Sequence, residues 1–235
     1  MVQKHERPCA LITGGAGGIG LALAKAVAGE GYRVALGGRD AARLQAAASQ
    51  AGAEFPLVLD VRDPDSVEAA FGRLEAQFGR LDLLVNSAGT GRFLSLEETD
   101  EASWAAMIDT NLTGTWRVIR RAMPLLLARR GMILNVISIG GRKAYPGSSA
   151  YGASKFGMLG LAESLREEFR GRGVRIINLL PGATATRFWE DIPGSWDRSR
   201  MIQPEDIAQA ALAAIRLPER ALVEEIVIRP ARGDL

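Results

Sequence analysis

The sequence predicts an α/β protein with a doubly wound, seven-stranded, mainly parallel Rossmann-type sheet flanked by helices on both faces. Short runs rich in Val, Ile and Leu alternate with longer stretches of helical periodicity, which is typical of βα units around a parallel sheet. A glycine-rich segment directly follows the first run, as in dinucleotide-binding folds. No linker, low-complexity tract or repeat divides the 235 residues. We therefore expect a single domain over 1–235, with a polar tail over about residues 1–7.

The apolar runs and periodic stretches give the expected elements in order. The expected strands are 9–13, 33–37, 55–59, 81–85, 132–138, 174–180 and 225–228, and the expected helices are 18–29, 41–51, 64–78, 101–129, 152–170 and 204–215. Asp63 before Pro64 is a helix-start signal, and Gly171 and Gly173 indicate a helix end. Pro124 falls inside 101–129, where its missing N–H predicts a kink or the end of the regular helix.

Charge and rare residues exclude several classes of protein. The 29 Lys and Arg nearly balance 27 Asp and Glu, so we expect no nucleic-acid partner. The single cysteine, Cys9, lies in an apolar run and the single histidine, His5, in the polar tail. We therefore expect a buried thiol and no disulfide framework, His-based triad or metal site. Without an apolar signal core or a long uncharged run, the expectation is a cytoplasmic protein with no membrane segment.

The glycine-rich segment predicts a phosphate-binding turn between the first strand and the first helix. Such a loop lets the backbone approach a pyrophosphate, while free N–H groups and the helix dipole attract the anion. The alternative is a glycine-rich turn that binds no ligand. The expected cofactor-binding residues here are Gly14, Gly15, Gly17, Gly18, Ile19 and Gly20.

The end of the second strand indicates the choice of cofactor. Gly38 occupies the place expected for an acid that holds a ribose hydroxyl, and Arg39 follows it. A guanidinium there pairs with the extra phosphate of NADP, so NADP(H) is favoured and NAD(H) is possible. Arg39 is otherwise an exposed loop arginine, and Asp40 is either a helix cap or the ribose-binding acid of an NAD enzyme.

Asp60 and Val61 follow the third strand at the same sheet edge. Ligands of doubly wound folds bind at this edge, so both residues are candidate cofactor contacts and Asp60 a candidate adenine contact. The alternative for Asp60 is a turn or cap aspartate.

A phenol and an ammonium four residues apart, Tyr151 and Lys155, share one face of a helix. A free phenol has a pKa near ~10, and lowering it by about three units takes ~4 kcal/mol. Lys155 together with an oxidised nicotinamide ring is expected to supply this stabilisation. Ser138 precedes Tyr151 by 13 residues and is a candidate hydrogen-bond donor to the substrate oxygen. Asn111 is a candidate holder of a water linked to Lys155. Taken alone, the Tyr–Lys pair also fits a half-buried tyrosine beside a surface lysine.

The order and spacing of these residues resemble the short-chain dehydrogenase/reductase family over about residues 9–230. The matching motifs are Thr13-Gly14-x-x-x-Gly18-x-Gly20, Asn86-Ser87-Ala88-Gly89, Asn111, Ser138, Tyr151-x-x-x-Lys155 and Pro181-Gly182. The resemblance implies a catalytic tetrad, with Tyr151 and Lys155 also touching the cofactor. It further implies a cofactor lining from Asn86, Ala88, Gly89, Pro181, Gly182 and Thr186. Taken singly, the Asn86 and Pro181 motifs also fit strand-ending turns.

Three positions depart from the pattern of the family. Ser87 stands in place of the usual second Asn, and Ile137 in place of the Ser before the catalytic one. Neither replaces a residue that is expected to react. Gly17 stands where many NADP-preferring relatives carry a basic residue. The NADP prediction therefore depends on Arg39.

Residues 187–203 have poor periodicity and three large aromatic side chains. The resemblance implies that this segment covers the substrate, so Phe188, Trp189, Trp196 and Met201 are candidate pocket walls. The alternative is an irregular loop that packs on the domain. Tyr145 is a further candidate for the pocket.

The favoured hypothesis is an NADP(H)-dependent oxidoreductase that moves a hydride between nicotinamide and a small carbonyl or alcohol, with Tyr151 as general acid and base. One alternative is a dinucleotide-binding sensor or scaffold without turnover, and the intact Tyr151 and Lys155 argue against it. The other is a lyase or epimerase that retains its nicotinamide. The resemblance also implies a homodimer or homotetramer built through 101–129 and 152–170.

Overall fold

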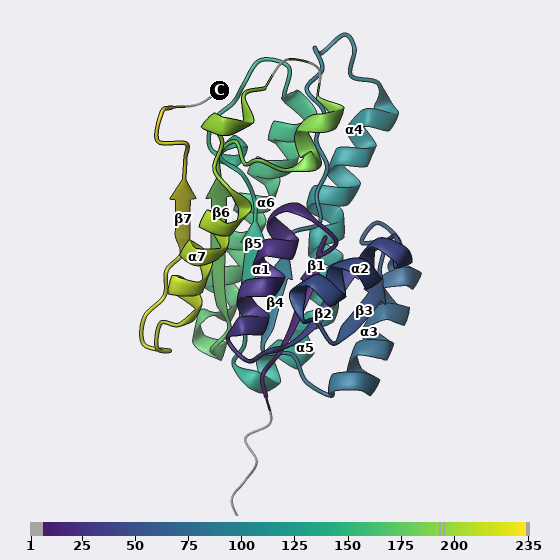
Figure 1. Ribbon diagram of the computed structural model, residues 1–235, viewed down its shortest axis with the longest axis vertical. Helices are drawn as coiled ribbons and strands as arrows, with labels where there is room; N and C mark the ends of the chain where they lie inside the picture. Colours follow the sequence, from purple (N-terminus) through teal and green to yellow (C-terminus); the bar gives the residue numbers. More distant parts are fainter. Residues whose placement is uncertain (1–6, 193, 195, 234–235) are drawn as a thin grey trace, which may run out of the picture.

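The computed structural model describes residues 7–192, 194 and 196–233, so His5 and most of the expected tail lie outside the described residues. One parallel sheet runs through this part of the chain in the order β3-β2-β1-β4-β5-β6-β7 (Figure 1). This order confirms the doubly wound fold. The strands are β1 (Cys9–Thr13), β2 (Arg33–Gly38), β3 (Phe55–Val58), β4 (Leu83–Asn86), β5 (Met132–Val136), β6 (Arg175–Pro181) and β7 (Glu225–Ile228).

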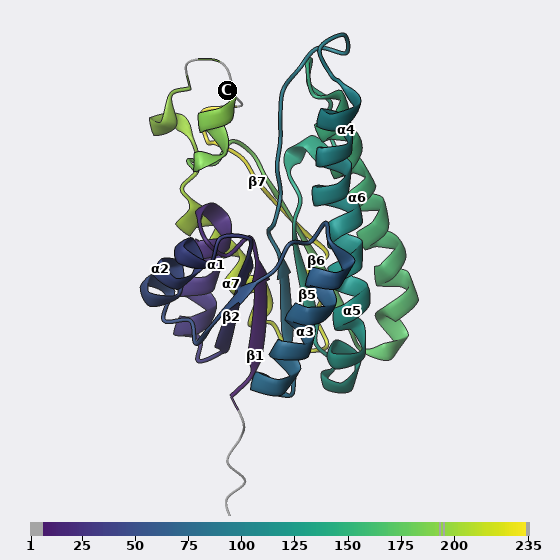
Figure 2. The same ribbon diagram turned by 90° about the vertical axis from the view of Figure 1, so that its right-hand side faces the viewer.

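Helices cover both faces of the sheet, with α1, α2 and α7 on one face and α3, α5 and α6 on the other (Figure 2). The α-helices are α1 (Gly18–Gly29), α2 (Ala41–Ala51), α3 (Pro64–Phe78), α4 (Glu101–Met107), α5 (Gly114–Arg129), α6 (Ser149–Phe169) and α7 (Pro204–Ile215). The shorter turns are η1 (Ile108–Thr113), η2 (Ile139–Gly141), η3 (Arg170–Arg172), η4 (Arg187–Asp191) and η5 (Arg198–Arg200). No described helix is long and apolar enough to cross a membrane.

Local signals fix where several helices begin and end. Asp63 caps α3 through the N–H of Asp65, with Pro64 in the first turn, as the sequence predicts. Gly52 and Gly79 end α2 and α3 with positive φ angles of 64° and 65°, the conformation that glycine adopts without strain.

The expected helix over 101–129 is continuous, but it is not a regular α-helix throughout. The chain forms α4, then the π-helical segment η1, then α5. Pro124 does not end the regular helix, because α5 continues through it to Arg129. The irregular segment lies upstream, around Asn111. A π-bulge of this kind adds backbone length without breaking the helix, and it often occurs at functional sites.

The two faces of the sheet differ in polarity. On the side of α1, α2 and α7 the strands contribute apolar side chains such as Leu36, Val85 and Leu134. On the side of α3, α5 and α6, apolar side chains share the face with a buried row of three asparagines. Asn86 Nδ2 donates to Asn135 Oδ1 at 2.9 Å, and Asn135 Nδ2 donates to Asn178 Oδ1 at 3.2 Å.

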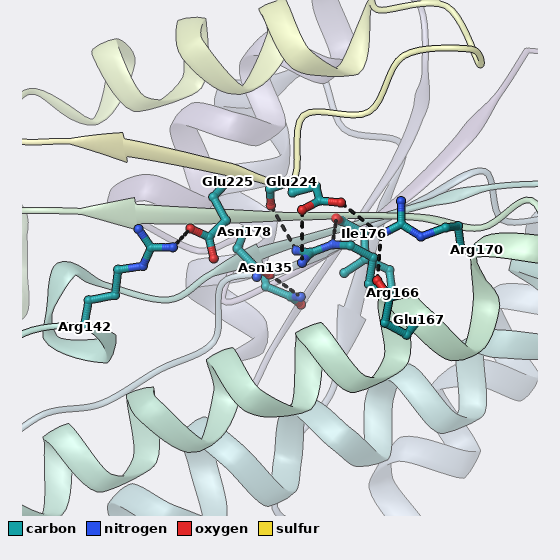
Figure 3. Close-up of polar contacts among 9 residues, drawn as sticks. All are labelled: Asn135, Arg142, Arg166, Glu167, Arg170, Ile176, Asn178, Glu224 and Glu225. Atoms are coloured by element: carbon teal, nitrogen blue, oxygen red, sulfur yellow. Dashed lines mark hydrogen bonds and ion pairs between the residues drawn. The ribbon is translucent and has the colours of Figure 1, made fainter.

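Beside this row, the buried guanidinium of Arg166 from α6 binds backbone on β6 and before β7 (Figure 3). Its Nε donates to the carbonyl of Ile176 and its Nη2 to the carbonyl of Glu224, each at 3.1 Å. Nearer the surface, Arg142 pairs with Glu225. The face under α6 therefore contains several polar contacts close together.

Candidate active site

The glycine loop is held tightly against its neighbours on one side and is open on the other. A Cβ on Gly14 (φ 66°) would lie 2.7 Å from the backbone nitrogen of Ala88, and one on Gly15 would lie 2.8 Å from the Leu36 side chain. Gly17 has space around it, and no described side chain caps α1. The first N–H groups of α1 are thus available to an anion.

Thr13 connects this loop to the turn after β4. Its Oγ1 accepts from the N–H groups of Ser87 and Ala88 at 3.1 and 3.2 Å and donates to the carbonyl of Val85 at 3.4 Å. The sequence analysis gave Thr13 no role. Its position just before Gly14, at the end of a buried strand, was the signal for this contact.

Asp40 and Asp60 are both engaged in local interactions. Asp40 caps α2 and accepts a hydrogen bond from the Arg43 N–H at 3.0 Å. Of the two roles predicted for Asp40, the structure confirms the helix cap. Asp60 binds Arg62 through both carboxylate oxygens, with Nη2 at 2.7 Å, and this ion pair lowers the pKa of Asp60. Arg39 is exposed and close enough to Asp60 to lower that pKa further.

Val61 is buried against α5 and is not exposed to the cleft. A Cβ on Gly114 would lie 2.7 Å from its Cγ2, and its carbonyl accepts from Arg117 at 3.2 Å. Ile19 lies in the first turn of α1 and is half-buried.

Tyr151 and Lys155 lie on the face of α6 that points to the ends of β4 and β5. The Tyr151 hydroxyl hydrogen-bonds with Ser138, and Lys155 Nζ lies 5.8 Å from the centroid of the Tyr151 ring. Lys155 Nζ also donates to the carbonyl of Val136 at 3.4 Å. Gly140 makes room for the pair of hydroxyls, because a Cβ there would lie 3.1 Å from Cε1 of Tyr151 and 3.3 Å from Oγ of Ser138.

Ser138 lies beyond the strand in which the sequence placed it. Because β5 ends at Val136, Ser138 instead caps the turn η2, where its Oγ accepts from the Gly140 N–H at 2.9 Å. This second bond fixes the orientation of the hydroxyl that faces Tyr151.

Asn111 is fully buried in η1, and its amide is held on three sides. It accepts from the Thr90 N–H and donates to the Thr90 carbonyl and to Ser154 Oγ, each at 2.9 Å. Ser154 in turn donates to the carbonyl of Tyr151 at 2.7 Å. Asn111 is therefore connected to α6 through Ser154, which lies within the Tyr151 motif but was not predicted as a site residue.

Burial controls the acidity of both titratable groups in this structure. The side chain of Tyr151 is half-buried, and desolvation raises its pKa to about 12 against the opposing effect of the hydrogen bond with Ser138. Desolvation lowers the pKa of Lys155 to about 8. The phenol acidified by Lys155 together with an oxidised nicotinamide stays a prediction for the cofactor-bound protein. In this structure burial disfavours phenolate more than the hydrogen bond with Ser138 favours it.

The residues implied by the family resemblance fall into two groups. Gly89 and Thr186 lie beside the candidate site. A Cβ on Gly89 would lie 3.3 Å from Asn111 Oδ1 and 3.7 Å from Lys155 Nζ, and Thr186 Cγ2 lies 3.1 Å from the place of a Cβ on Gly18. Asn86 and Gly182 make contacts within the sheet instead. Asn86 binds Asn135, and the Gly182 N–H donates to the carbonyl of Ile228 at 2.7 Å. Pro181 ends β6 beside Gly182, and Ala88 lies under the glycine loop.

Aromatic rings surround the ring of Tyr151. Phe93 and Phe188 have centroids 5.7 and 5.9 Å from it. Trp189 packs on Phe188 at 5.8 Å and on Trp196 at 4.7 Å. The sequence analysis missed Phe93, which follows β4 in an irregular segment without a motif.

Met201 and Tyr145 do not share this position. Met201 is buried. Tyr145 lines a separate cavity of about 380 Å³, together with Leu94, Leu96 and Phe156. Residues 193 and 195 of the expected pocket segment lie outside the described residues.

A model of the family described as short chain dehydrogenase matches residues 8–195. The chain belongs to this family. A probable NADP-dependent dehydrogenase of Haemophilus influenzae is 35% identical, and the match covers 94% of this chain and 92% of the relative. A sepiapterin reductase of Chlorobaculum tepidum is also 35% identical, with 96% and 97% covered. The crystal structure of an alcohol dehydrogenase from Thermococcus sibiricus, complexed with 5-hydroxy-NADP, has a TM-score of 0.89 and 32% identity, with 98% and 99% covered.

Within this short-chain dehydrogenase, the matched segment contains both the glycine loop and the Ser138–Tyr151–Lys155 group. Both lie at the carboxyl ends of the parallel strands, the edge where α/β sheets bind ligands. The chain is thus an oxidoreductase of the short-chain dehydrogenase type.

Proposed function

We propose that the protein is an NADP(H)-dependent reductase or dehydrogenase that interconverts a small carbonyl compound and its alcohol. The observation that carries this proposal is the hydrogen bond between the Tyr151 hydroxyl and Ser138, one helix turn from the buried amine of Lys155. These three groups lie at the same sheet edge as the open glycine loop.

The residues at this edge fit a nicotinamide dinucleotide. The loop leaves backbone space at Gly17 and uncapped N–H groups at the start of α1, which suit a pyrophosphate. Gly89 leaves the Lys155 amine and the Asn111 amide close to the turn after β4. We assign the pyrophosphate contact to Gly14–Gly20 and the nicotinamide-end contacts to Gly89, Lys155, Pro181, Gly182 and Thr186. The bound cofactor supplies hydride to the substrate or accepts it.

In the reduction direction, Tyr151 delivers a proton to the substrate oxygen. Its raised pKa, about 12, keeps the hydroxyl protonated at neutral pH, so it is ready to donate. Ser138, fixed by the Gly140 N–H, donates a hydrogen bond to the same oxygen and stabilises the charge that develops on it. The amine of Lys155 lowers the cost of removing the proton from Tyr151.

Asn111 is proposed as a positioning residue. Its bonds to Thr90 and Ser154 fix the segment η1 against α6, where it holds the approach to Lys155 open to a water. The proton lost by Tyr151 is replaced along this route.

NADP(H) is favoured over NAD(H) because the end of β2 offers a cation and no free acid. Arg39 is exposed there, and the carboxylate of Asp40 is used as the cap of α2. The relative from Haemophilus influenzae and the structure from Thermococcus sibiricus, which carry NADP in their descriptions, support this choice.

A homo-oligomer assembled through α4, α5 and α6 is part of the proposal. Trp104, Trp116 and Phe156 are exposed on these three helices. Exposed large apolar side chains of this kind favour a contact with a second subunit.

Substitution of Tyr151 by Phe tests the proposed chemistry. The ring contacts with Phe93 and Phe188 are retained and the hydroxyl is lost, so we expect turnover to fall by about 100-fold or more with NADPH affinity unchanged within about twofold. Turnover is followed by NADPH oxidation over a panel of ketones, aldehydes, quinones, sugars and acyl thioesters, and affinity by calorimetry.

Tyr145→Phe is the matched control, because Tyr145 lines the separate cavity. It should keep wild-type turnover. A Tyr151→Phe enzyme with near-wild-type turnover would remove Tyr151 from the proposed role.

A further inference from the structure

Arg43 places a second guanidinium beside the glycine loop. It lies in the first turn of α2, and its backbone N–H donates to the capping carboxylate of Asp40 at 3.0 Å. From this fixed base the side chain reaches back toward the loop. A Cβ on Gly17 would lie 3.8 Å from Nη2 of Arg43, the nearest described atom outside the adjoining residues of the loop.

The guanidinium of Arg43 makes no hydrogen bond or ion pair with any residue of the described chain. By contrast, Arg62, Arg121 and Arg216 each form an ion pair with an acidic side chain. Asp40, the nearest acid in sequence, uses its Oδ1 as the helix cap. Asp60 is bound by Arg62. Arg43 therefore offers its full set of donors to a ligand.

The position of Arg43 lies between two parts of a dinucleotide site. The Gly15 N–H donates to the carbonyl of Gly37 at 3.2 Å, so the loop and the end of β2 are adjacent. In this fold the pyrophosphate lies at the loop and the adenosine ribose at the end of the second strand. A side chain that starts on α2 and ends beside Gly17 spans the space above that ribose.

Gly38 leaves this end of β2 without an acidic side chain. A Cβ there would lie 3.3 Å from Cδ2 of the buried Leu44, so a larger side chain requires Leu44 to shift by a few tenths of an ångström. The ribose region then has two cations, Arg39 and Arg43, while Asp40 caps α2 and Asp60 is paired with Arg62. Two guanidinium groups suit a dianionic phosphate.

We propose that Arg43 is a second ligand of the 2′-phosphate of NADP(H), closing over Gly17 opposite Arg39, and that it contributes to cofactor selectivity. This inference rests on the proposed function, because it assigns a further binding residue for the same cofactor. The contact is specific to the extra phosphate, so its loss affects NADPH and leaves NADH.

The test measures dissociation constants by calorimetry for NADPH, NADH, 2′,5′-ADP and 5′-ADP. Replacement of Arg43 by Gln should weaken binding of NADPH and 2′,5′-ADP by about 10-fold to 100-fold, the range expected for a charged hydrogen-bonding contact. Binding of NADH and 5′-ADP should change by less than about twofold. Arg220→Gln, which removes an exposed arginine from the loop before β7 at the opposite sheet edge, is the control for net charge.

Moving the positive charge from position 43 to position 17 gives a second, independent test. Gly17 has φ 174°, an extended conformation that any residue adopts, so Lys is tolerated there. In the Arg43→Gln background, Gly17→Lys should recover at least a fivefold gain in NADPH affinity with little change for NADH, because its side chain starts 3.8 Å from the place that the guanidinium left.

Binding of NADPH and NADH to the wild-type protein distinguishes a wrong cofactor assignment from a wrong role of Arg43. If it binds NADPH no more tightly than NADH, the proposed cofactor assignment is wrong and the role of Arg43 is wrong with it. If it prefers NADPH and Arg43→Gln leaves that preference unchanged, or weakens both cofactors equally, only the role of Arg43 is overturned.

Discussion

The two faces of the sheet are built from neighbouring residues of the same strands, yet only one of them carries buried polar groups. Leu134 and Asn135 follow each other on β5 and are both buried. Leu134 packs in the apolar core with α1, α2 and α7, whereas Asn135 binds Asn86 and Asn178 under α6. The face that receives α6, the helix with Tyr151 and Lys155, is the polar one.

The polar face lowers the stability of the fold, and it fixes the relative position of the strands. Asn86 Oδ1 and Asn178 Nδ2, the two ends of the asparagine row, are buried without a partner among the described residues, and such groups reduce stability. In return, the row fixes the relative position of β4, β5 and β6 just below Ser138 and Gly89. Buried polar groups specify one arrangement more strictly than apolar packing does.

The largest effect is expected from exchanging the two residue types on β5. Leu134→Asn places an unpaired amide in the apolar face and removes apolar burial, so it should lower the free energy of unfolding by about 4 kcal/mol. Asn135→Leu breaks two hydrogen bonds but gains apolar burial, and it should cost about 2 kcal/mol. Urea denaturation monitored by circular dichroism measures both.

If Leu134→Asn and Asn135→Leu lower the free energy of unfolding by the same amount, the two faces of the sheet do not differ in the way described. A stabilising Asn135→Leu would show that the polar face accepts a leucine as well as the apolar face does. Leu134→Ala is the matched control for volume, with a cost of about 3 kcal/mol from the cavity alone.

The buried amine of Lys155 should make the cofactor-free protein less stable than a variant with an apolar side chain. Its pKa is lowered from 10.5 to about 8, so the folded state penalises the charged form. The penalty is fully present below pH 8 and disappears as pH rises toward 10.5, because only there does the unfolded chain also lose its proton. Lys155→Met should therefore raise stability by roughly 3 kcal/mol at pH 7.

Denaturation of both proteins at pH 7 and at pH 10 checks the sign of this effect. The advantage of the Met variant must shrink at the higher pH. An advantage that is independent of pH would instead reflect better packing of Met.

The sequence predicts the apolar face of this molecule better than the polar one. Strand and helix positions follow from the periodicity of Val, Ile and Leu. The helices α1, α2 and α7 on the apolar face all have the predicted bounds, whereas only α3 does so on the other face. The π-helical segment η1 was missed because the apolar periodicity continues through it. The acidified phenol stays a prediction for the protein with an oxidised nicotinamide bound, and the desolvation that raises the pKa of Tyr151 in this structure cannot be read from sequence spacing.

The candidate site shows the same limit. The residues named in motifs are at the sheet edge, as the strand ends predict. Thr13, Phe93 and Ser154 were missed because their roles come from contacts with segments distant in sequence, such as those of Thr13 with Ser87 and of Ser154 with Asn111.

The smallest effects should come from the two arginines that border the polar face (Figure 3). The side chain of Arg166 is 6% exposed and binds two carbonyls, so Arg166→Met should cost about 2 kcal/mol by leaving these carbonyls unpaired. The side chain of Arg142 is 48% exposed, and it pairs only with Glu225 among the described acids. Solvent screening limits such a pair, so Arg142→Gln should cost less than about 1 kcal/mol, and less still in 1 M salt. Both losses of unfolding free energy are measured by urea denaturation. Equal losses would mean that Arg166 acts by its charge alone, and that binding buried carbonyls stabilises the fold no more than a surface ion pair does.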